Sequence, residues 1–482
     1  MAFLIGGANS LTGGYEISNS LRFDGDSYQS RDPSETGITI KGNFSAWVKF
    51  ATSNTEVALF GGFDSSGAND NDGYMVFKRT ADGNLQFEGG DNVYLETTAL
   101  FRDTSAWYHI VLAIDSSNAT ANNKQRIYVN GVEITAFDTR NNLTNLQDLP
   151  MNSTAGNDDR FLVGCDEDTG GRGLFFTGYM ADVYWIDNNS QMAASDFGEY
   201  NDNGVWIPKD GSDISFGDKN SFKMEYGSSG NLGLDSSGLG NSLGDNAGLA
   251  ATNQTTDTPT NNFCTMNPLD VGSDLRDNGS FAEGNLEVTN GATSGQADQQ
   301  RVRGTIAVTK GKWYFEMKQI ANSASIGVLA TEAAHGGTSA NSMLVEYNDG
   351  GEIRFFNGSG RTTKTTGIDT FDDDDIVGCA LDMDNRRAYF HKNGTYQGDP
   401  TPDPAGSPSG AGQFGGIQTG FTMAPCMFDN SSGSAGKGSF NFGNAPFAIS
   451  SGNSDGAGFG NFEYAVPSGY FSLCTKNLAT YG

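Results

Sequence analysis

Carboxylate and amide side chains gather in short loops of this sequence, and such oxygen donors are the ligands that calcium prefers. One group comprises Asp64 and 69–72, and another comprises 157–159 just before an apolar run. Calcium takes six to eight oxygen ligands, which acidic loops of this kind can supply. The candidate calcium ligands are Asp64, Asp70, Asp72, Asp158 and Asp159. A solvated acidic turn explains the same pattern, and no EF-hand spacing decides between the two.

Carboxylates could also catalyse glycoside hydrolysis, which needs an acid and a nucleophile about 5 Å apart on one face of a strand. A Glu-x-Asp-x-Glu arrangement of that kind is missing; the nearest pattern, Glu346 to Glu352, has the wrong spacing and predicts a turn. His109, His335 and His391 are scattered along the sequence. No nucleophile elbow or phosphate-binding loop occurs either. We therefore expect no enzymatic activity.

Exposed aromatic rings are a third kind of candidate, because they can stack on the apolar faces of sugars. Tyr94, Phe175 and Tyr347 fall near the ends of predicted strands, and Asn348 adds an amide beside Tyr347. We predict these four as ligand-binding residues. Packing inside the fold is the alternative, and it is the expectation for Trp47, Trp107, Trp185 and Trp313.

The overall charge restricts the partners. The chain has 482 residues, and its 58 acidic and 29 basic residues give a net charge of −29. Such a surface repels phosphate backbones and anionic lipid headgroups, so we expect neither nucleic-acid binding nor membrane insertion. No apolar run approaches the length of a membrane-spanning helix.

The five cysteines are far apart and show no metal-ligand spacing. We therefore expect reduced, partly buried thiols in a protein that folds in a cytoplasm. The first residues lack a basic segment followed by an apolar one, so no secretory signal is expected.

Short runs of aromatic and β-branched residues alternate with turn residues along most of the chain. Gly makes up 66 residues, and Asp-Gly or Asn-Gly pairs separate several of the runs, as in β-hairpins. Such pairs stand at 82–83 and 130–131, and 347–351 predicts a further turn. The pattern predicts an all-β protein with no helix longer than two turns.

Residues 18–200 resemble the concanavalin A-like fold of laminin G and pentraxin type. The resemblance rests on 44–49, 107–112, 126–131 and 178–183, which follow one another in the family's order and spacing. It implies two packed antiparallel sheets whose rim loops bind glycans or proteins, often with calcium.

Residues 278–447 resemble the SPRY domain. Gly311 to Glu316, Asp375 to Gly378 and Tyr389 to Gly394 carry this second resemblance. It implies another antiparallel β-sandwich that binds partners through its loops without catalysis. The fold class is therefore all-β, with two antiparallel sandwiches joined by a Gly/Asn/Ser-rich segment.

Three further segments complete the expected organisation: an N-terminal attachment arm at 1–17, a linker or arm at 201–277 and a C-terminal tail at 448–482. The ends of the two halves echo each other, because 258–268 and 466–478 share a proline, an aromatic residue and Cys-Thr-x-Asn. We interpret each as the closing segment of one sandwich.

The layout as a whole, including 2–10, resembles tail-fibre-like and surface proteins of phages. The resemblance implies a non-enzymatic virion protein, a tail fibre or a head fibre or decoration, that binds glycan or protein on the host surface. Its partners would be other virion proteins and further copies of itself, with a trimer as the expected oligomer. An architectural capsid or tail protein without a receptor is the alternative, and a glycan-acting enzyme is less favoured.

Overall fold

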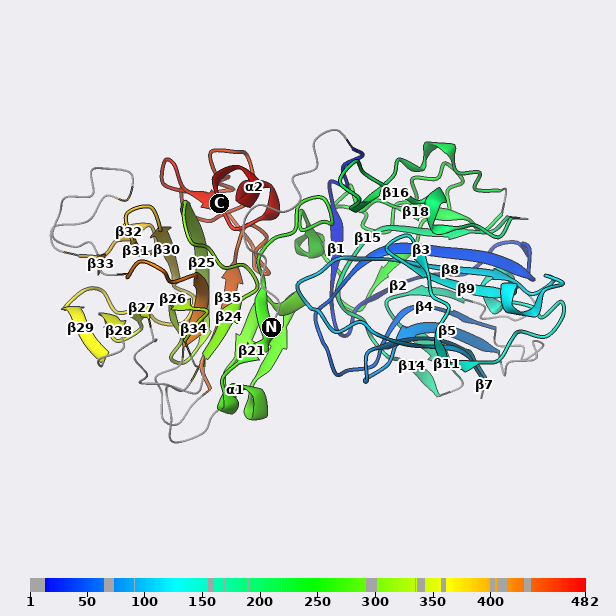
Figure 1. Cartoon of the computed structure of the whole chain (residues 1–482), viewed down its shortest axis with the longest axis horizontal. Helices are drawn as coiled ribbons and strands as arrows, with labels where there is room; N and C mark the ends of the chain where they lie inside the picture. The colour runs from blue at the N-terminus through cyan, green and yellow to red at the C-terminus, as the bar shows by residue number, and fades with distance from the viewer. Residues whose placement is uncertain are drawn as a thin grey trace. The chain divides into compact units, whose positions relative to one another are not determined.

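The computed structural model consists of two β-rich units, Leu11–Thr260 and Asn261–Gly482, which we call the N-terminal and C-terminal units. The residues it describes are the following ranges: 14–64, 73–90, 92–154, 160–168, 170–188, 190–217, 219–291, 301–333, 335, 343–356, 361–398, 404, 414–415, 417–428 and 435–482. The predicted all-β class is confirmed (Figure 1).

The N-terminal unit is built on two large antiparallel sheets and two small hairpins. The first sheet has the order β10-β9-β8-β3-β15-β1-β20, and β18 also pairs with β15. Its strands are Ser20–Asp24 (β1), Lys41–Phe50 (β3), Tyr108–Asp115 (β8), Gln125–Val129 (β9), Val132–Glu133 (β10), Thr177–Ile186 (β15), Phe222–Met224 (β18) and Gln254–Thr255 (β20).

The second sheet of this unit has the order β11-β7-β6-β5-β4-β12-β2-β19. Its strands are Tyr28–Arg31 (β2), Val57–Phe63 (β4), Tyr74–Arg79 (β5), Asn84–Gly89 (β6), Asn92–Leu100 (β7), Phe137–Arg140 (β11), Arg160–Val163 (β12) and Gly244–Asn246 (β19). The hairpins pair Asp166–Asp168 (β13) with Gly171–Gly173 (β14) and Gly198–Tyr200 (β16) with Trp206–Pro208 (β17).

The C-terminal unit repeats the plan with two sheets of its own. One has the order β21-β24-β34-β26-β27-β28-β29. Its strands are Met266–Val271 (β21), Arg301–Gly304 (β24), Ser325–Ala330 (β26), Leu344–Asn348 (β27), Glu352–Phe356 (β28), Arg361–Thr366 (β29) and Met423–Phe428 (β34).

The other sheet has the order β22-β23-β35-β25-β30-β31-β32, with β33 beside β31 and β36 beside β25. Its strands are Ser280–Ala282 (β22), Glu287–Thr289 (β23), Lys312–Ala321 (β25), Ile376–Asp382 (β30), Arg387–Lys392 (β31), Thr395–Tyr396 (β32), Phe414–Gly415 (β33), Lys437–Asn441 (β35) and Phe471–Ser472 (β36). The α-helices among the described residues are Ser273–Asn278 (α1) and Thr475–Tyr481 (α2). None of the described helices has the length and hydropathy needed to cross a membrane.

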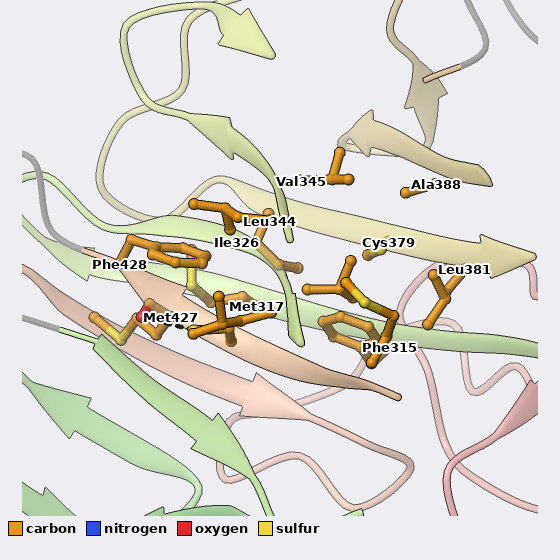
Figure 2. Packing of buried hydrophobic residues seen from close by; sticks show 14 of the residues in the cluster. Phe315, Met317, Ile326, Leu344, Val345, Cys379, Leu381, Ala388, Met427 and Phe428 are labelled. Atoms are coloured by element: carbon orange, nitrogen blue, oxygen red, sulfur yellow. Dashed lines mark hydrogen bonds between the residues drawn. The ribbon is translucent and has the colours of Figure 1, made fainter. Parts of the chain in front are cut away.

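Alternation along the central strands builds the main cores. In β3, Phe44, Ala46 and Val48 point into the cluster between the two sheets, because successive side chains of a strand face opposite ways. In the C-terminal unit, Phe315 and Met317 of β25 do the same, packing with Ile326 and Met427 (Figure 2). The intervening residues face outward.

These outward-facing residues are buried as well, because later parts of the chain cover them. In the N-terminal unit, Tyr184 and Ile186 of β15 pack with Phe197 and Trp206. In the C-terminal unit, Tyr314 and Tyr389 pack with Phe462 and Tyr470. We call 190–217 and 453–470 the covering segments of the two units.

The segment expected as a linker or arm packs on the N-terminal unit over most of its length. Of 201–277, residues up to Thr260 belong to the N-terminal unit, where β18 pairs with β15 and β19 pairs with β2. The buried ion pair between Lys49 Nζ and Asp257 Oδ2, 2.9 Å long, fixes the end of this segment to β3. Composition alone suggested a segment without a core of its own, but its scattered apolar and charged residues pack on a sandwich already formed.

The two echoing segments also lie where sequence did not place them. Phe263 and Cys474 form an antiparallel bridge, and the Cys264 N–H donates to the Leu473 carbonyl at 2.9 Å. Both therefore meet inside the C-terminal unit instead of closing one sandwich each.

The predicted turns are confirmed where the structure describes them. Asn130 and Gly131, with φ of 48° and 83°, join β9 to β10, and Val129 pairs with Val132. Positive φ at both positions is the geometry that Asn-Gly favours in two-residue hairpins. The pairs β5–β6 and β27–β28 are likewise hairpins.

Candidate functional site

The strand ends that carry the predicted calcium loops lie beside one another. Phe63 at the end of β4 pairs with both Tyr74 of β5 and Arg160 of β12, so the chain enters 65–72 and leaves 155–159 at neighbouring positions. Asp64 is buried and its N–H donates to the Gly73 carbonyl at 2.6 Å. Ser153 Oγ donates to the Asp64 carboxylate at 3.5 Å. The other candidate ligands, Asp70, Asp72, Asp158 and Asp159, lie outside the described residues.

The described residues contain no group of three or more His, Cys, Asp or Glu side chains arranged to hold a metal ion. The structure thus shows that the strand ends bordering the two acidic segments are neighbours. Asp64 is the one candidate ligand whose position it describes.

Two of the predicted binding aromatics are part of the cores, so the expectation that their rings are exposed is wrong. Tyr94 is 6% exposed, packs on Phe87 and accepts a hydrogen bond from Gln147 Nε2 at 2.7 Å. Tyr347 is fully buried, and its hydroxyl donates to the Asp369 carbonyl at 2.6 Å. Each hydroxyl finds a partner inside the fold, which lets a tyrosine near a strand end turn inward.

The remaining predicted residues, Asn348 and Phe175, lie in different settings. Asn348 is 2% exposed, and its side-chain carbonyl accepts the Glu352 N–H at 2.9 Å, closing the hairpin. Phe175 is half-buried and contacts the Tyr28 ring with centroids 6.0 Å apart. The structure does not bring the four predicted residues together, since Tyr94 and Phe175 belong to one unit and Tyr347 and Asn348 to the other.

A column of aromatic rings crosses the outer face of the first N-terminal sheet. Ring centroids are 5.0 Å apart between Trp47 and His109, 5.8 Å between His109 and Trp206, and 4.9 Å between Trp206 and Tyr200. Trp47 and His109 are buried, whereas Tyr200 is 54% exposed at the outer end. The column thus connects the sheet to solvent.

Hydrogen bonds fix the histidine inside this column. Trp206 Nε1–H donates to His109 Nδ1 at 3.1 Å, so Nε2 carries the proton and donates to Ser45 Oγ at 2.9 Å. Burial lowers the His109 pKa to about 3, which keeps the ring neutral at physiological pH. A neutral, doubly hydrogen-bonded histidine orients its neighbours and is a poor proton donor or acceptor for catalysis.

Sequence reasoning missed Trp206 and Tyr200 as a pair because it placed the boundary between the sandwich and the linker or arm directly after residue 200. The available signal was the spacing of the two aromatic residues around Asn201 to Val205, a polar stretch typical of a hairpin turn. They are cross-strand partners in β16 and β17.

A buried carboxyl group on a residue with an unusual backbone angle lies on the same face of this sheet. Asp182 has φ of 44° at a register shift between Ala181 and Tyr184 of β15, and it is 3% exposed. Burial, reinforced by the charge of Glu225, raises its pKa to about 7, although Lys223 opposes the rise. Buried groups with perturbed pKa and unusual backbone angles are enriched at functional sites.

The surroundings of Asp182 include Tyr15, one of the first residues that the structure describes. Tyr15 Oη lies 3.5 Å from both Glu225 Oε1 and Lys223 Nζ, and it hydrogen-bonds Asp182. Within the expected 1–17 attachment arm, Tyr15 and Ile17 thus pack on the sandwich, while 1–13 lie outside the described residues.

The C-terminal unit has a buried polar chain of its own. His391 Nε2–H donates to Tyr314 Oη at 2.7 Å, because His391 Nδ1 accepts the Gly394 N–H at 3.2 Å. Tyr314 in turn donates to Glu316 at 2.9 Å. Glu316 also accepts from Asn441 and from the backbone N–H groups of the covering segment at 463 and 464. The hydrogen bonds that join His391, Tyr314, Glu316 and Asn441 are buried, and the two backbone N–H groups join the sheet to its covering segment.

The third histidine belongs to an ionic cluster. Arg303 Nη1 lies 3.0 Å from Asp270 Oδ1, and His335 Nε2 lies 2.6 Å from the same oxygen. Burial raises the pKa of Asp270, but the hydrogen bonds from His335 and Arg303 outweigh it and leave the pKa below its ordinary value. The cluster keeps one carboxylate ionised beside one arginine and ties β21 to β24.

Comparison with known proteins finds one family model that matches part of the chain. Residues 24–190 match the model of the concanavalin A-like lectin/glucanases superfamily, in its laminin G form. That match covers the sandwich strands β2 to β15. No curated protein matches the chain significantly.

Solved structures to which this chain is similar include the following three. The pair of domains LG4-5 of the mouse laminin α1 chain is 10% identical over 90% of this chain and 91% of its own, with a TM-score of 0.29. The SPRY domain of human HERC1 is 19% identical over 32% of this chain and 87% of its own, with a TM-score of 0.23. A putative carbohydrate binding protein from Bacteroides ovatus is 16% identical over 50% of this chain and 60% of its own, with a TM-score of 0.32.

Proposed function

We propose that this chain is a non-enzymatic binding protein on the surface of a phage particle, as a tail fibre or a head fibre or decoration. It attaches the particle to glycan or protein on the host surface. The observation that carries the binding role is the match of 24–190 to the concanavalin A-like lectin/glucanases superfamily. The fold alone does not determine which ligand is bound, so the ligand has to be inferred from the side chains of the binding site.

The proposed calcium site of this protein is at Asp64 and the adjoining acidic segments. The strand ends that border 65–72 and 155–159 are neighbours, and the sequence of these segments contains the other proposed ligands, Asp70, Asp72, Asp158 and Asp159. Calcium bound there would link the two segments and fix the rim for ligand binding. The proposed partners are other virion proteins and two further copies of this chain.

The test is binding of the purified full-length protein to candidate host bacteria and to polysaccharide extracted from their surface, with calcium and with excess EDTA. Saturable binding that EDTA abolishes supports both the attachment role and the calcium site. Binding that survives EDTA retains the attachment role and removes calcium from it. If correctly folded, assembled protein shows no binding, the attachment role is wrong and a purely architectural role in the particle takes its place.

The absence of catalysis is tested in the same samples. We expect no reducing sugar to be released from the extracted polysaccharide during prolonged incubation. Release that persists in the wild type and disappears after a carboxylate substitution would identify a glycan-acting enzyme.

A further inference from the structure

Tyr200 presents an aromatic ring to solvent in a fixed orientation. The residue is 54% exposed, although its hydroxyl donates to the Asn130 carbonyl at 3.2 Å. Its ring meets the Trp206 ring at an interplanar angle of 71°. The ring is therefore held at both its hydroxyl and one edge, and ordering it on ligand binding costs little entropy.

Two glycines let the supporting Trp206 approach the backbone closely. A Cβ on Gly131 would come within 2.3 Å of the indole, and one on Gly198 within 2.5 Å. Neither distance is possible without displacement, so the absence of both side chains creates the slot that Trp206 fills. The slot and the hydrogen bond to His109 hold Trp206 in place, and Trp206 in turn supports the Tyr200 ring.

The hairpin that carries Tyr200 also has exposed polar residues. The Asn201 side-chain carbonyl accepts the N–H groups of Asn203 and Val205 at 3.0 and 2.9 Å, which sets the turn. Asp202 and Asn203 are exposed on that turn. Glu199, next to Tyr200 in β16, is also exposed. Carboxylate and amide groups next to an exposed ring suit a ligand with an apolar face and hydroxyl groups at its edge.

We propose that Tyr200 is the stacking platform of a saccharide-binding site for neutral pyranose units, with Asp202 and Asn203 of the adjoining turn as the groups that bind the sugar hydroxyls. The inference rests on the proposed attachment role and names its ligand class and residues. A neutral sugar fits because the adjoining turn carries the carboxylate of Asp202 on a chain of net charge −29, which repels uronic and sialic acids. The site lies on the sheet opposite the one that carries the proposed calcium site, so it is a separate site.

The experiment is calorimetric titration of the full chain with neutral hexasaccharides, namely malto-, cello-, laminari-, chito- and mannohexaose, and with oligogalacturonate as an acidic counterpart. We expect saturable binding of at least one neutral hexasaccharide and none of oligogalacturonate. Tyr200→Ala should weaken that binding about tenfold, since an aromatic contact contributes roughly 0.5–1.5 kcal/mol. Tyr200→Phe keeps the ring but loses the bond to Asn130, so we expect a loss of about two- to threefold, which corresponds to a fraction of that energy.

Tyr481→Ala is the matched control, because Tyr481 is also exposed, at 38%, and stacks on Phe471 in the other unit. It should bind like the wild type. Thermal unfolding of each variant shows whether the fold is intact. If Tyr200→Ala unfolds at a lower temperature than the wild type, Tyr200→Phe and Asn203→Ala are used for the test instead.

If the wild type binds a saccharide and Tyr200→Ala binds it equally well, this site alone is wrong. Failure of the wild type to bind any hexasaccharide or host polysaccharide overturns the glycan-binding role together with it. If Tyr200→Ala weakens attachment to cells but no saccharide binds, the ligand is a protein and the saccharide site is wrong.

Discussion

The buried histidines of the two units make equivalent hydrogen bonds, but the networks to which they belong end in different places. His109 and His391 both face outward from a sheet, both are buried, and burial lowers the pKa of each to about 3. In both, Nδ1 accepts a hydrogen bond and Nε2–H donates one. The network of His109 continues through Trp206 to the exposed Tyr200. That of His391 continues through Tyr314 to Glu316, which is fully buried.

The difference lies in the covering segments. In the N-terminal unit the segment folds into the β16–β17 hairpin, and its aromatic pair ends in solvent. In the C-terminal unit the backbone at 463 and 464 closes over the carboxylate of Glu316. The outer faces of the two sheets are alike, but the covering segments differ. In the N-terminal unit the covered face leads to an exposed ring, and in the C-terminal unit it forms a second core.

The largest expected effect comes from the ion pair that fixes the end of the N-terminal unit. Asp257→Ala removes the carboxylate that Lys49 Nζ contacts at 2.9 Å and that also accepts from Trp107 Nε1 at 3.2 Å. Breaking a buried pair from one side costs about 3–5 kcal/mol. We expect the free energy of unfolding of the N-terminal unit to fall by that amount while the C-terminal unit is unaffected.

Cysteine labelling during urea unfolding measures the two units separately. All five cysteines are buried and none forms a disulfide; Cys165 is in the N-terminal unit and Cys264, Cys379, Cys426 and Cys474 are in the other. Asp257→Ala should bring forward the labelling of Cys165 alone. Earlier labelling of all five thiols would show that 201–260 stabilises both units. Lys49→Met combined with Asp257→Leu should recover most of the lost stability.

Glu316→Ala is the counterpart in the C-terminal unit. It leaves the hydroxyl of Tyr314, the amide of Asn441 and two backbone N–H groups without the carboxylate that accepts from them. Several buried donors left without this acceptor cost about 3 kcal/mol in total. The four C-terminal thiols should react at lower urea concentration, and Cys165 should not. An unchanged labelling pattern would mean that water replaces the carboxylate, and that this network is less important than its burial suggests.

The pH dependence of the two units should have opposite signs. The Asp182 pKa is raised from 3.8 to about 7 in the folded N-terminal unit, so the unfolded chain releases this proton first and the free energy of unfolding falls as pH rises from about 4 to 7. Asp182→Asn keeps a residue that tolerates φ of 44° and removes the titration. We expect the variant to lose this slope and to be about 2 kcal/mol more stable than wild type at pH 8.

The groups that face Asp182 are the phenols, carboxylates and ammonium of Tyr15, Tyr184, Glu225, Asp210 and Lys223. For Asp270 in the C-terminal unit the pKa is lowered instead, so its contribution is present above the ordinary pKa and is lost as pH falls below about 4. Urea titrations from pH 3 to 8 test how the free energy of unfolding of each unit depends on pH. Labelling of Cys165 reports on the N-terminal unit, and labelling of the other four cysteines reports on the C-terminal unit. Parallel slopes in the two units would contradict this assignment.

The smallest effect is expected at Phe175. Its ring is half-buried and contacts Tyr28, so Phe175→Ala should cost about 1 kcal/mol, less than a fully buried ring. We expect hexasaccharide titrations to give wild-type affinity, in contrast to Tyr200→Ala. A loss of binding would show that the aromatic residue chosen from sequence is part of the saccharide site.

The amino-acid sequence determined the local structure of this protein. Period-two alternation identifies strands such as β3 and β25, because a strand with one face in a core needs an apolar side chain at every second position. Asn-Gly at 130–131 and Asp-Gly at 82–83 identify two of the hairpins, since positive φ is accessible to those residues. The aromatic and turn motifs around them were also sufficient for the resemblance that the match of 24–190 confirms.

Only the tertiary structure decided which residues between the strands are buried. Tyr94 and Tyr347 look like rim residues in sequence, yet Gln147 and the Asp369 carbonyl satisfy their hydroxyls inside the fold. Tyr200 is the last residue of the segment 18–200 that the sequence assigns to the sandwich, and it is exposed beside Trp206, which fills the slot between Gly131 and Gly198. A strand pattern is set by neighbours two residues apart. Burial of an outer face is set by segments that return to it from more than 200 residues away, such as Asp257 to Lys49 with a separation of 208. Local spacing carries no information about such returns, so the sequence determined the strands and the covering segments determined the site.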